Sequence, residues 1–207
     1  MAPVSDSGRR HWDTLYGAKA ANEVSWFQAW PKTSLRLLSS VASPASATID
    51  VGGGASTLVD ALLDAGWSDV TVFDVSTKAL DVVARRLEER RHEVSFVAAD
   101  VLSWQPQRSY DAWHDRAVFH FLVEPHDQQR YIATATRAVA PGGVAIIGTF
   151  AADGPTHCSG LPTARYTAED LGATFTPAFR LIRAEREEHS TPSGVVQPFT
   201  WVVLRRA

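Results

Sequence analysis

The sequence lacks the features that mark secreted and membrane-spanning proteins. It has a single cysteine, Cys158, in 207 residues, which excludes an internal disulfide. No apolar run approaches the ~20 residues that span a bilayer, and residues 1–10 lack the apolar core of a signal peptide. We therefore expect a cytoplasmic protein with no membrane partner.

An excess of charge of one sign is also missing. Lys and Arg number 20 and Asp and Glu number 23, which gives a net charge of −3. This balance predicts no nucleic-acid partner, because such a partner requires a basic surface. One cysteine and scattered histidines also lack the spacing of a metal site, so we expect no bound metal. The composition, 45% hydrophobic and 21% charged, is that of one globular enzyme domain.

The most informative segment that is present runs from Thr48 to Ser56 and reads T-I-D-V-G-G-G-A-S. A second apolar segment, V-T-V-F-D, ends in Asp74. Strand, glycine turn, helix, strand and acid is the order in which an open α/β sheet holds a cofactor that carries a ribose. The dinucleotide fingerprint G-x-G-x-x-G fails at its third glycine, where Thr57 stands. Two acids at strand ends suit a ligand that offers an amino group and ribose hydroxyls.

The run D-V-G-G-G-A-S resembles the D-x-G-x-G-x-G motif of the class I S-adenosylmethionine-dependent methyltransferases, with serine at the last glycine. Further landmarks of that family follow in order: an acid after F-V-A-A, a fourth strand Y-D-A-W-H-D, and P-G-G before the fifth strand. The resemblance implies S-adenosylmethionine as cofactor. It implies that the ribose binds Asp74, that adenine lies against Val75, and that the adenine amine binds Asp100. The cofactor-binding residues it implies are Tyr16, Trp26, Asp50, Gly52, Gly53, Gly54, Asp74, Val75, Asp100, Val101, Asp115 and Arg116.

The predicted fold is α/β, a Rossmann-like open sheet of about seven strands with helices on both faces. Leucines with helical spacing follow the glycine turn and again follow Asp74, which predicts two crossover helices between parallel strands. Pro125 begins another helix that runs to about Val139. Two strand-like runs, 179–187 and 197–204, flank P-S-G and predict a closing antiparallel hairpin.

We expect one methyltransferase domain over residues 1–207 in three parts. Residues 1–42 form a helical lid or substrate segment, residues 46–150 form the cofactor-binding core, and residues 151–207 form a substrate loop and the hairpin. The first part contains W-D-x-x-Y, from Trp12 to Tyr16, and Trp26 further on. It is similar to the opening of two methyltransferase branches, the thiopurine type and a protein-lysine type. Such aromatic residues suit a cationic sulfonium, but they equally suit a packed amphipathic helix.

The stretch H-D-R-A-V-F-H leaves the fourth strand where the methyl group would be presented. In the lysine-methylating branch it reads acid, lysine, glycine, threonine and, two positions later, an acid or amide. Here Ala117 and Val118 replace the glycine and threonine, and His120 takes the last position. We expect Asp115 and His120 to be catalytic, His120 by accepting a proton. The alternative for His120 is packing beside its phenylalanine neighbours.

Polar residues of the last third are candidates for a substrate wall. They are His157, Cys158, Arg165, Glu188, His189 and Gln197. The sequence favours methyl transfer to an O, N or S nucleophile of a small molecule, with a protein lysine as the alternative acceptor. A cofactor-binding regulatory protein without activity is the second alternative.

Overall fold

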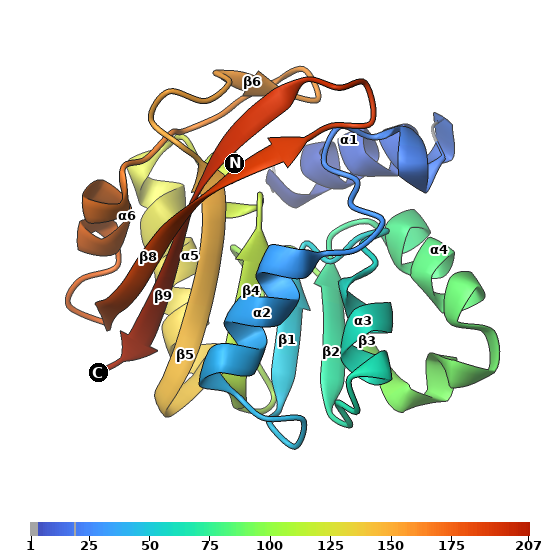
Figure 1. Ribbon diagram of the computed structural model, residues 1–207, viewed down its shortest axis with the longest axis horizontal. Coiled ribbons are helices and arrows are strands. Elements are labelled where there is room, and N and C mark those ends of the chain that lie inside the picture. The colour runs from blue at the N-terminus through green and yellow to red at the C-terminus, as the bar shows by residue number, and fades with distance from the viewer. Residues whose placement is uncertain (1–3, 19) are drawn as a thin grey trace.

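The computed structural model describes residues 4–18 and 20–207. Its centre is a seven-stranded sheet (Figure 1) with the strand order β3-β2-β1-β4-β5-β9-β8. The strands are β1 (Thr48–Val51), β2 (Val70–Asp74), β3 (Val94–Ala98), β4 (Tyr110–Arg116), β5 (Val139–Phe150), β8 (Phe179–Ser190) and β9 (Val196–Arg206). The pairs from β3 to β5 are parallel, and β9 runs antiparallel to both β5 and β8. This confirms the predicted sheet and its closing hairpin.

Helices cover both faces of the sheet. One face packs against α2 (Lys32–Val41), α3 (Leu58–Asp64) and α4 (Thr77–Leu87), and the other packs against α5 (Pro125–Ala138) and α6 (Ala168–Thr174). Neighbouring residues of one strand enter different cores, as Ile146 and Ile147 do, because successive side chains of a strand point to opposite faces. The interior strands therefore bury apolar side chains on both faces, with polar residues among them toward the site.

The remaining elements lie around the carboxyl ends of the strands or connect them. They are the helix α1 (Val4–Ala18), the 3₁₀ turns η1 (Ala21–Glu23), η2 (Glu88–Glu93) and η3 (Phe119–Phe121), and the short pair β6 (His157–Cys158) and β7 (Leu161–Pro162). Helix α1 lies beyond the end of the sheet toward which β1 and β2 run (Figure 1). Within residues 4–18 and 20–207, no helix is long and apolar enough to cross a membrane.

Two local features differ from the sequence expectation or refine it. β5 begins at Val139 rather than after P-G-G, because Tyr110 pairs with Val139 and Ala112 with Val144, so the P-G-G segment bulges out between them. Helix α6 begins with a side-chain cap, since the Thr167 hydroxyl accepts the Asp170 N–H at 3.1 Å.

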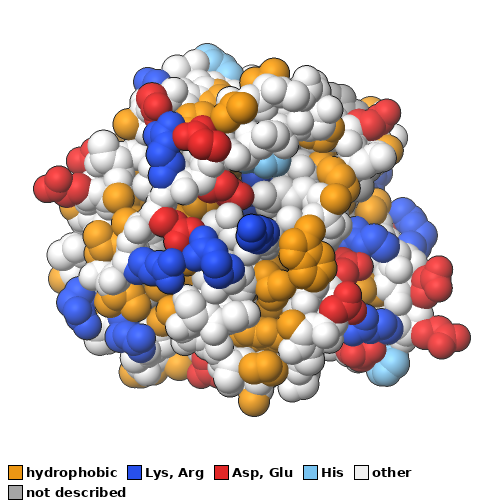
Figure 2. Space-filling model, in the orientation of Figure 1, with side chains coloured by type: hydrophobic (Ala, Val, Ile, Leu, Met, Phe, Trp, Pro, Cys, Tyr) orange, Lys and Arg blue, Asp and Glu red, His pale blue; other side chains and the backbone are white. Residues whose placement is uncertain are grey.

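One edge of the sheet is β8, and half of its twelve side chains are charged. Arg36 and Arg183 both pair with Glu185, and Arg186 pairs with Asp153 at 2.9 Å. Acidic and basic side chains are interspersed over this face (Figure 2). Charges on an edge strand discourage pairing with another chain.

Candidate active site

Two adjacent spaces, which share part of their lining, open at the carboxyl ends of β1, β2 and β4, where the strand order reverses. The larger has a volume of about 320 Å³ and the smaller about 50 Å³. Tyr16, Trp26, Gly52 and Arg116 line both. In open α/β sheets this switch point is the usual ligand site.

The glycine turn lets the backbone approach the cavity closely. Gly52 and Gly54 have positive φ angles of 67° and 42°, a region that favours glycine. A Cβ added at Gly53 would lie 2.8 Å from the Asp50 carboxylate. A side chain at any of these three positions would therefore strain the turn or collide with its neighbours.

Asp50 forms a buried pair that the sequence reasoning missed. Its Oδ1 lies 2.7 Å from Nδ1 of His114, and both side chains are buried. Asp50 and His114 line the smaller space, and His114 Nε2 has no hydrogen-bond partner in the described part of the chain. The pairing of β1 with β4 places these two residues in register. Only a known strand order could have revealed this contact from the sequence.

Asp74 is buried at the end of β2 and faces the larger cavity. Burial raises the pKa of this carboxyl to about 7, against the lowering effect of the Ser76 N–H, which donates to Oδ1 at 2.8 Å. The Ser76 hydroxyl in turn donates to Asp13 of α1 at 2.6 Å. Asp13, the acid of the W-D-x-x-Y segment, therefore ties α1 to the loop that follows Asp74.

Asp100 and its neighbours complete the same side of the larger cavity. Asp100 lines the cavity after β3, and its Oδ1 accepts the Leu102 N–H at 2.9 Å. Val75 and Val101 line the cavity beside it. We call the part of the larger cavity formed after β2 and β3 the acidic half, because it contains the carboxyl groups of Asp74 and Asp100.

Aromatic side chains from residues 12–26 close over the cavity. Trp12 packs edge-to-face against Trp26, with ring centroids 5.9 Å apart, and against Phe121 at 5.1 Å. Tyr16 contacts Trp26 at 6.3 Å, and burial raises the pKa of its hydroxyl. The segment therefore packs on the cavity wall and also presents rings to the cavity. A packed helix and an aromatic surface for a sulfonium, the two alternatives for these residues, are compatible.

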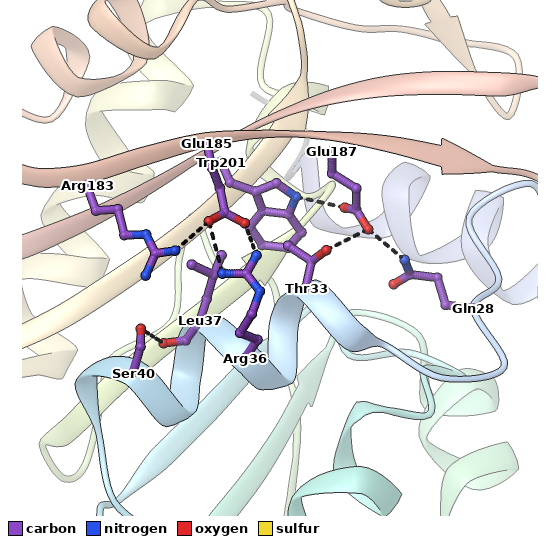
Figure 3. A network of polar contacts seen from close by, with 9 residues as sticks. All are labelled: Gln28, Thr33, Arg36, Leu37, Ser40, Arg183, Glu185, Glu187 and Trp201. Carbon is purple, nitrogen blue, oxygen red and sulfur yellow. Dashed lines mark hydrogen bonds and ion pairs between the residues drawn. The ribbon is translucent and has the colours of Figure 1, made fainter.

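The segment that carries Trp26 is held by side chains from distant parts of the chain. Glu187 of β8 accepts hydrogen bonds from Gln28 at 3.1 Å and Thr33 at 3.0 Å, and from Trp201 of β9 at 2.8 Å (Figure 3). Arg116 donates to the Trp26 carbonyl at 2.9 Å. The C-terminal hairpin thus fixes the position of the N-terminal segment.

Asp115 does not line either space. Its carboxylate accepts the N–H groups of Val118 at 2.8 Å and Phe119 at 3.1 Å, and the hydroxyl of Tyr131. The side chain has 0% exposure, and burial raises its pKa to about 6. Because strand side chains alternate, His114 and Arg116 point to the face opposite Asp115. We therefore assign Asp115 to holding the β4–η3 turn rather than to contact with cofactor or substrate.

Arg116 lies on the boundary between the two spaces. Its Nη1 donates to Trp26, while its buried Nε and Nη2 have no partner among the described residues. The guanidinium carbon lies 4.6 Å from the centre of the Phe199 ring. Burial lowers the pKa of this group to about 10, so it keeps its charge at neutral pH.

His120 has 0% exposure and lines the larger cavity, beside the rings of Phe121 and Phe150. Neither ring nitrogen has a partner in the described part of the chain. Burial, followed by the charge of Arg116, lowers the pKa of His120 to about 3. His120 therefore lacks the near-neutral pKa that the expected proton acceptor requires.

Two of the six candidates from the last third reach the larger cavity, namely Cys158 and Gln197. The other four lie elsewhere: His157, Arg165 and Glu188 are exposed, and His189 is buried with its Nε2 2.8 Å from the Ser25 carbonyl. The lining contributed by β4, β5, β9 and their loops includes Phe121, Phe150 and Phe199 and contains no carboxyl group. We call this part the aromatic half.

Comparisons with known proteins find one matching family model and many solved structures of similar fold. Residues 49–143 match a family model described as a methyltransferase domain. No curated protein matches the sequence. Solved structures do match over nearly the whole chain, and three of them are described next.

The N-methyltransferase NodS from Bradyrhizobium japonicum WM9, in complex with S-adenosyl-L-homocysteine, is 18% identical, with a TM-score of 0.73 over 95% of this chain and 98% of its own. A methyltransferase from Anabaena variabilis ATCC 29413 is 16% identical, with a TM-score of 0.76 over 100% and 96%. The 1,6-didemethyltoxoflavin-N1-methyltransferase of Burkholderia thailandensis is 19% identical, with a TM-score of 0.70 over 97% and 84%. At such identities the likeness concerns the fold.

Residues 49–143 match a methyltransferase domain, and the fold of the chain is that of solved S-adenosylmethionine-dependent methyltransferases. Two of the three structures described above hold S-adenosylhomocysteine, the product of that cofactor. These findings confirm the family resemblance and the fold predicted from the sequence, and the roles of the individual acids stay predictions.

Proposed function

We propose that this protein moves a methyl group from S-adenosylmethionine to an O, N or S nucleophile of a small molecule. The observation that supports this most strongly is one continuous cavity at the switch point of the sheet, with an acidic half and an aromatic half. A cofactor with donor groups suits the first half, and an apolar acceptor suits the second.

The acidic half and the smaller space fit this cofactor by their donor and acceptor chemistry. Carboxylates of Asp74 and Asp100 accept hydrogen bonds, as ribose hydroxyls and an adenine amine require. Asp50, held by His114, offers a negative charge to an ammonium group. The turn Gly52–Gly54 leaves room for close approach, and Val75, Val101, Tyr16 and Trp26 supply apolar contact.

The cofactor brings a methyl group that is already activated on a sulfonium. The protein's part is then to orient the acceptor, which can supply roughly 7 to 11 kcal/mol of the barrier. We propose that residues 1–42 act as a lid, residues 46–150 as the cofactor core, and residues 151–207 as the substrate loop and hairpin.

The test is calorimetric titration with S-adenosylmethionine and S-adenosylhomocysteine, with NADH as control. We expect micromolar binding of both sulfur ligands and none of NADH. Absence of binding by either sulfur ligand would overturn the proposal. Methylated product from a panel of small nucleophiles would then separate an enzyme from a cofactor-binding regulator, and label in protein alone would favour the lysine alternative.

A further inference from the structure

The aromatic half contains a cationic side chain with no acidic side chain beside it among the described residues. Among the residues that the structure describes, its ionisable side chains are Arg116, His120 and Cys158, and it has no carboxyl group. Those that line the whole larger cavity are Tyr16, Asp74, Asp100, Arg116, His120 and Cys158. Building on the proposed methyl transfer, we propose that the acceptor is a small, flat, acidic molecule that binds as an anion against Arg116.

Arg116 offers a site for an anion because two of its three guanidinium nitrogens have no hydrogen-bond partner among the described residues. The two nitrogens without a partner, Nε and Nη2, belong to one edge of the planar guanidinium. That edge matches a carboxylate or another oxyanion through two parallel bonds, or a single anionic atom through one shared site. A buried cation with unsatisfied donors is costly, and an anionic ligand would remove that cost.

The position of Arg116 favours the acceptor over the cofactor as its partner. Its guanidinium packs on Phe199, which lines the aromatic half and not the smaller space. That half is also lined by Phe121, Phe150 and Leu161, which suit a flat apolar body.

His120 fits an acceptor that arrives without its proton. Its imidazole is neutral, since burial and Arg116 oppose a second proton. A neutral imidazole has one N–H donor, so His120 can donate a hydrogen bond to an anion but is a poor base for an alcohol or an ammonium ion.

A protonated amine finds no counter-ion in the aromatic half among the residues that the structure describes. Asp115 lies outside the cavity with its oxygens satisfied, and Glu187 is occupied by three donors. This argues against a lysine side chain as acceptor, because its ammonium would lose water and meet Arg116.

The chemistry balances without a base. The acceptor loses its proton to solvent when it binds. Its lone pair then forms the bond to the methyl carbon, while the carbon–sulfur bond breaks with its electron pair passing to sulfur. Anion and sulfonium are both neutralised in this step. Acidic thiols, phenols and heterocyclic N–H groups belong to the predicted class.

The experiment titrates 4-nitrophenol from pH 5 to 9 into protein saturated with S-adenosylhomocysteine, since the absorbance of this phenol reports its ionisation directly. We expect the bound phenol to ionise about one pH unit lower than the free phenol, which is about tenfold tighter binding of the anion. 4-Nitroaniline, of similar shape but neutral, and 4-nitrobenzylamine, a cation, should bind more weakly.

Variants assign the effect to Arg116. Arg116→Gln should abolish the downward shift, Arg116→Lys should retain part of it, and Arg165→Gln, on an exposed arginine outside the cavity, should leave it unchanged. A shift that persists in Arg116→Gln, tighter binding of the amine, or no binding of the phenol to the saturated protein would each overturn the inference. Failure of S-adenosylhomocysteine itself to bind would instead overturn the proposed function.

Discussion

The two halves of the larger cavity are built in different ways. The acidic half comes from the ends of β2 and β3 and the short connections after them: Asp74 ends β2, and Asp100 follows β3 after one residue. The aromatic half is assembled from β4, η3, β5, β6, β7 and β9, whose lining residues range from Arg116 to Phe199. Class I methyltransferases need one cofactor and serve many acceptors. A local, repeated construction suits the first task, and a composite wall suits the second.

The largest expected effect is a loss of stability when the turn that leads into the aromatic half is changed. Asp115→Ala removes three hydrogen bonds that hold the turn leading into the aromatic half. We expect the free energy of unfolding to fall by about 3 kcal/mol, because two buried N–H groups and a hydroxyl lose a charged acceptor. Denaturant titration measures this, with the exposed Asp81→Ala as control. Equal stability of the two variants would remove Asp115 from that structural role.

A smaller effect is expected when the acidic half alone is changed. Asp74→Asn should weaken binding of S-adenosylhomocysteine by about 1 to 3 kcal/mol, because hydroxyls lose a charged acceptor. The thermal midpoint should stay close to that of the wild type, because the amide oxygen can still accept the Ser76 N–H. Calorimetry on this variant and on Asp81→Asn decides the matter. Unchanged affinity would separate Asp74 from the cofactor.

The smallest effect is the response of cofactor affinity to pH. The pKa of Asp74 is about 7 before the ligand binds, and hydroxyl donors favour the ionised form. Lowering the pH from 8 to 6 should therefore weaken binding of S-adenosylhomocysteine about tenfold, with a proton released on binding near pH 6. Titrations in buffers of different ionisation enthalpy detect that proton. The same pH response in Asp74→Asn would assign it to another group.

If the acceptor is an anion, binding in both halves should tighten as the pH rises, but through different groups. Raising the pH ionises both Asp74 and the acceptor, but only the second event draws on Arg116. The 4-nitrophenol titration and the cofactor titration therefore test separate groups in one cavity.

The sequence by itself determined the order in which strands and helices follow one another along the chain. It also determined which acids lie at the ends of β2 and β3, where the acidic half forms. Its glycine turn and acids each follow an apolar strand segment, so local order along the chain was enough to predict them, together with the crossover helices and the hairpin. These features depend on neighbours in sequence, where spacing and periodicity carry the information.

Only the tertiary structure decided which distant residues meet, which way their side chains point and how deeply they are buried. It paired His114 with Asp50 across 64 residues, directed Asp115 away from the cavity while Arg116 faces it, and buried His120 so that its pKa falls to about 3. It also used Glu187 to hold the Trp26 segment. The physical reason is that strand order, side-chain alternation and burial arise from contacts between distant segments, and these contacts set both the direction and the charge of each group.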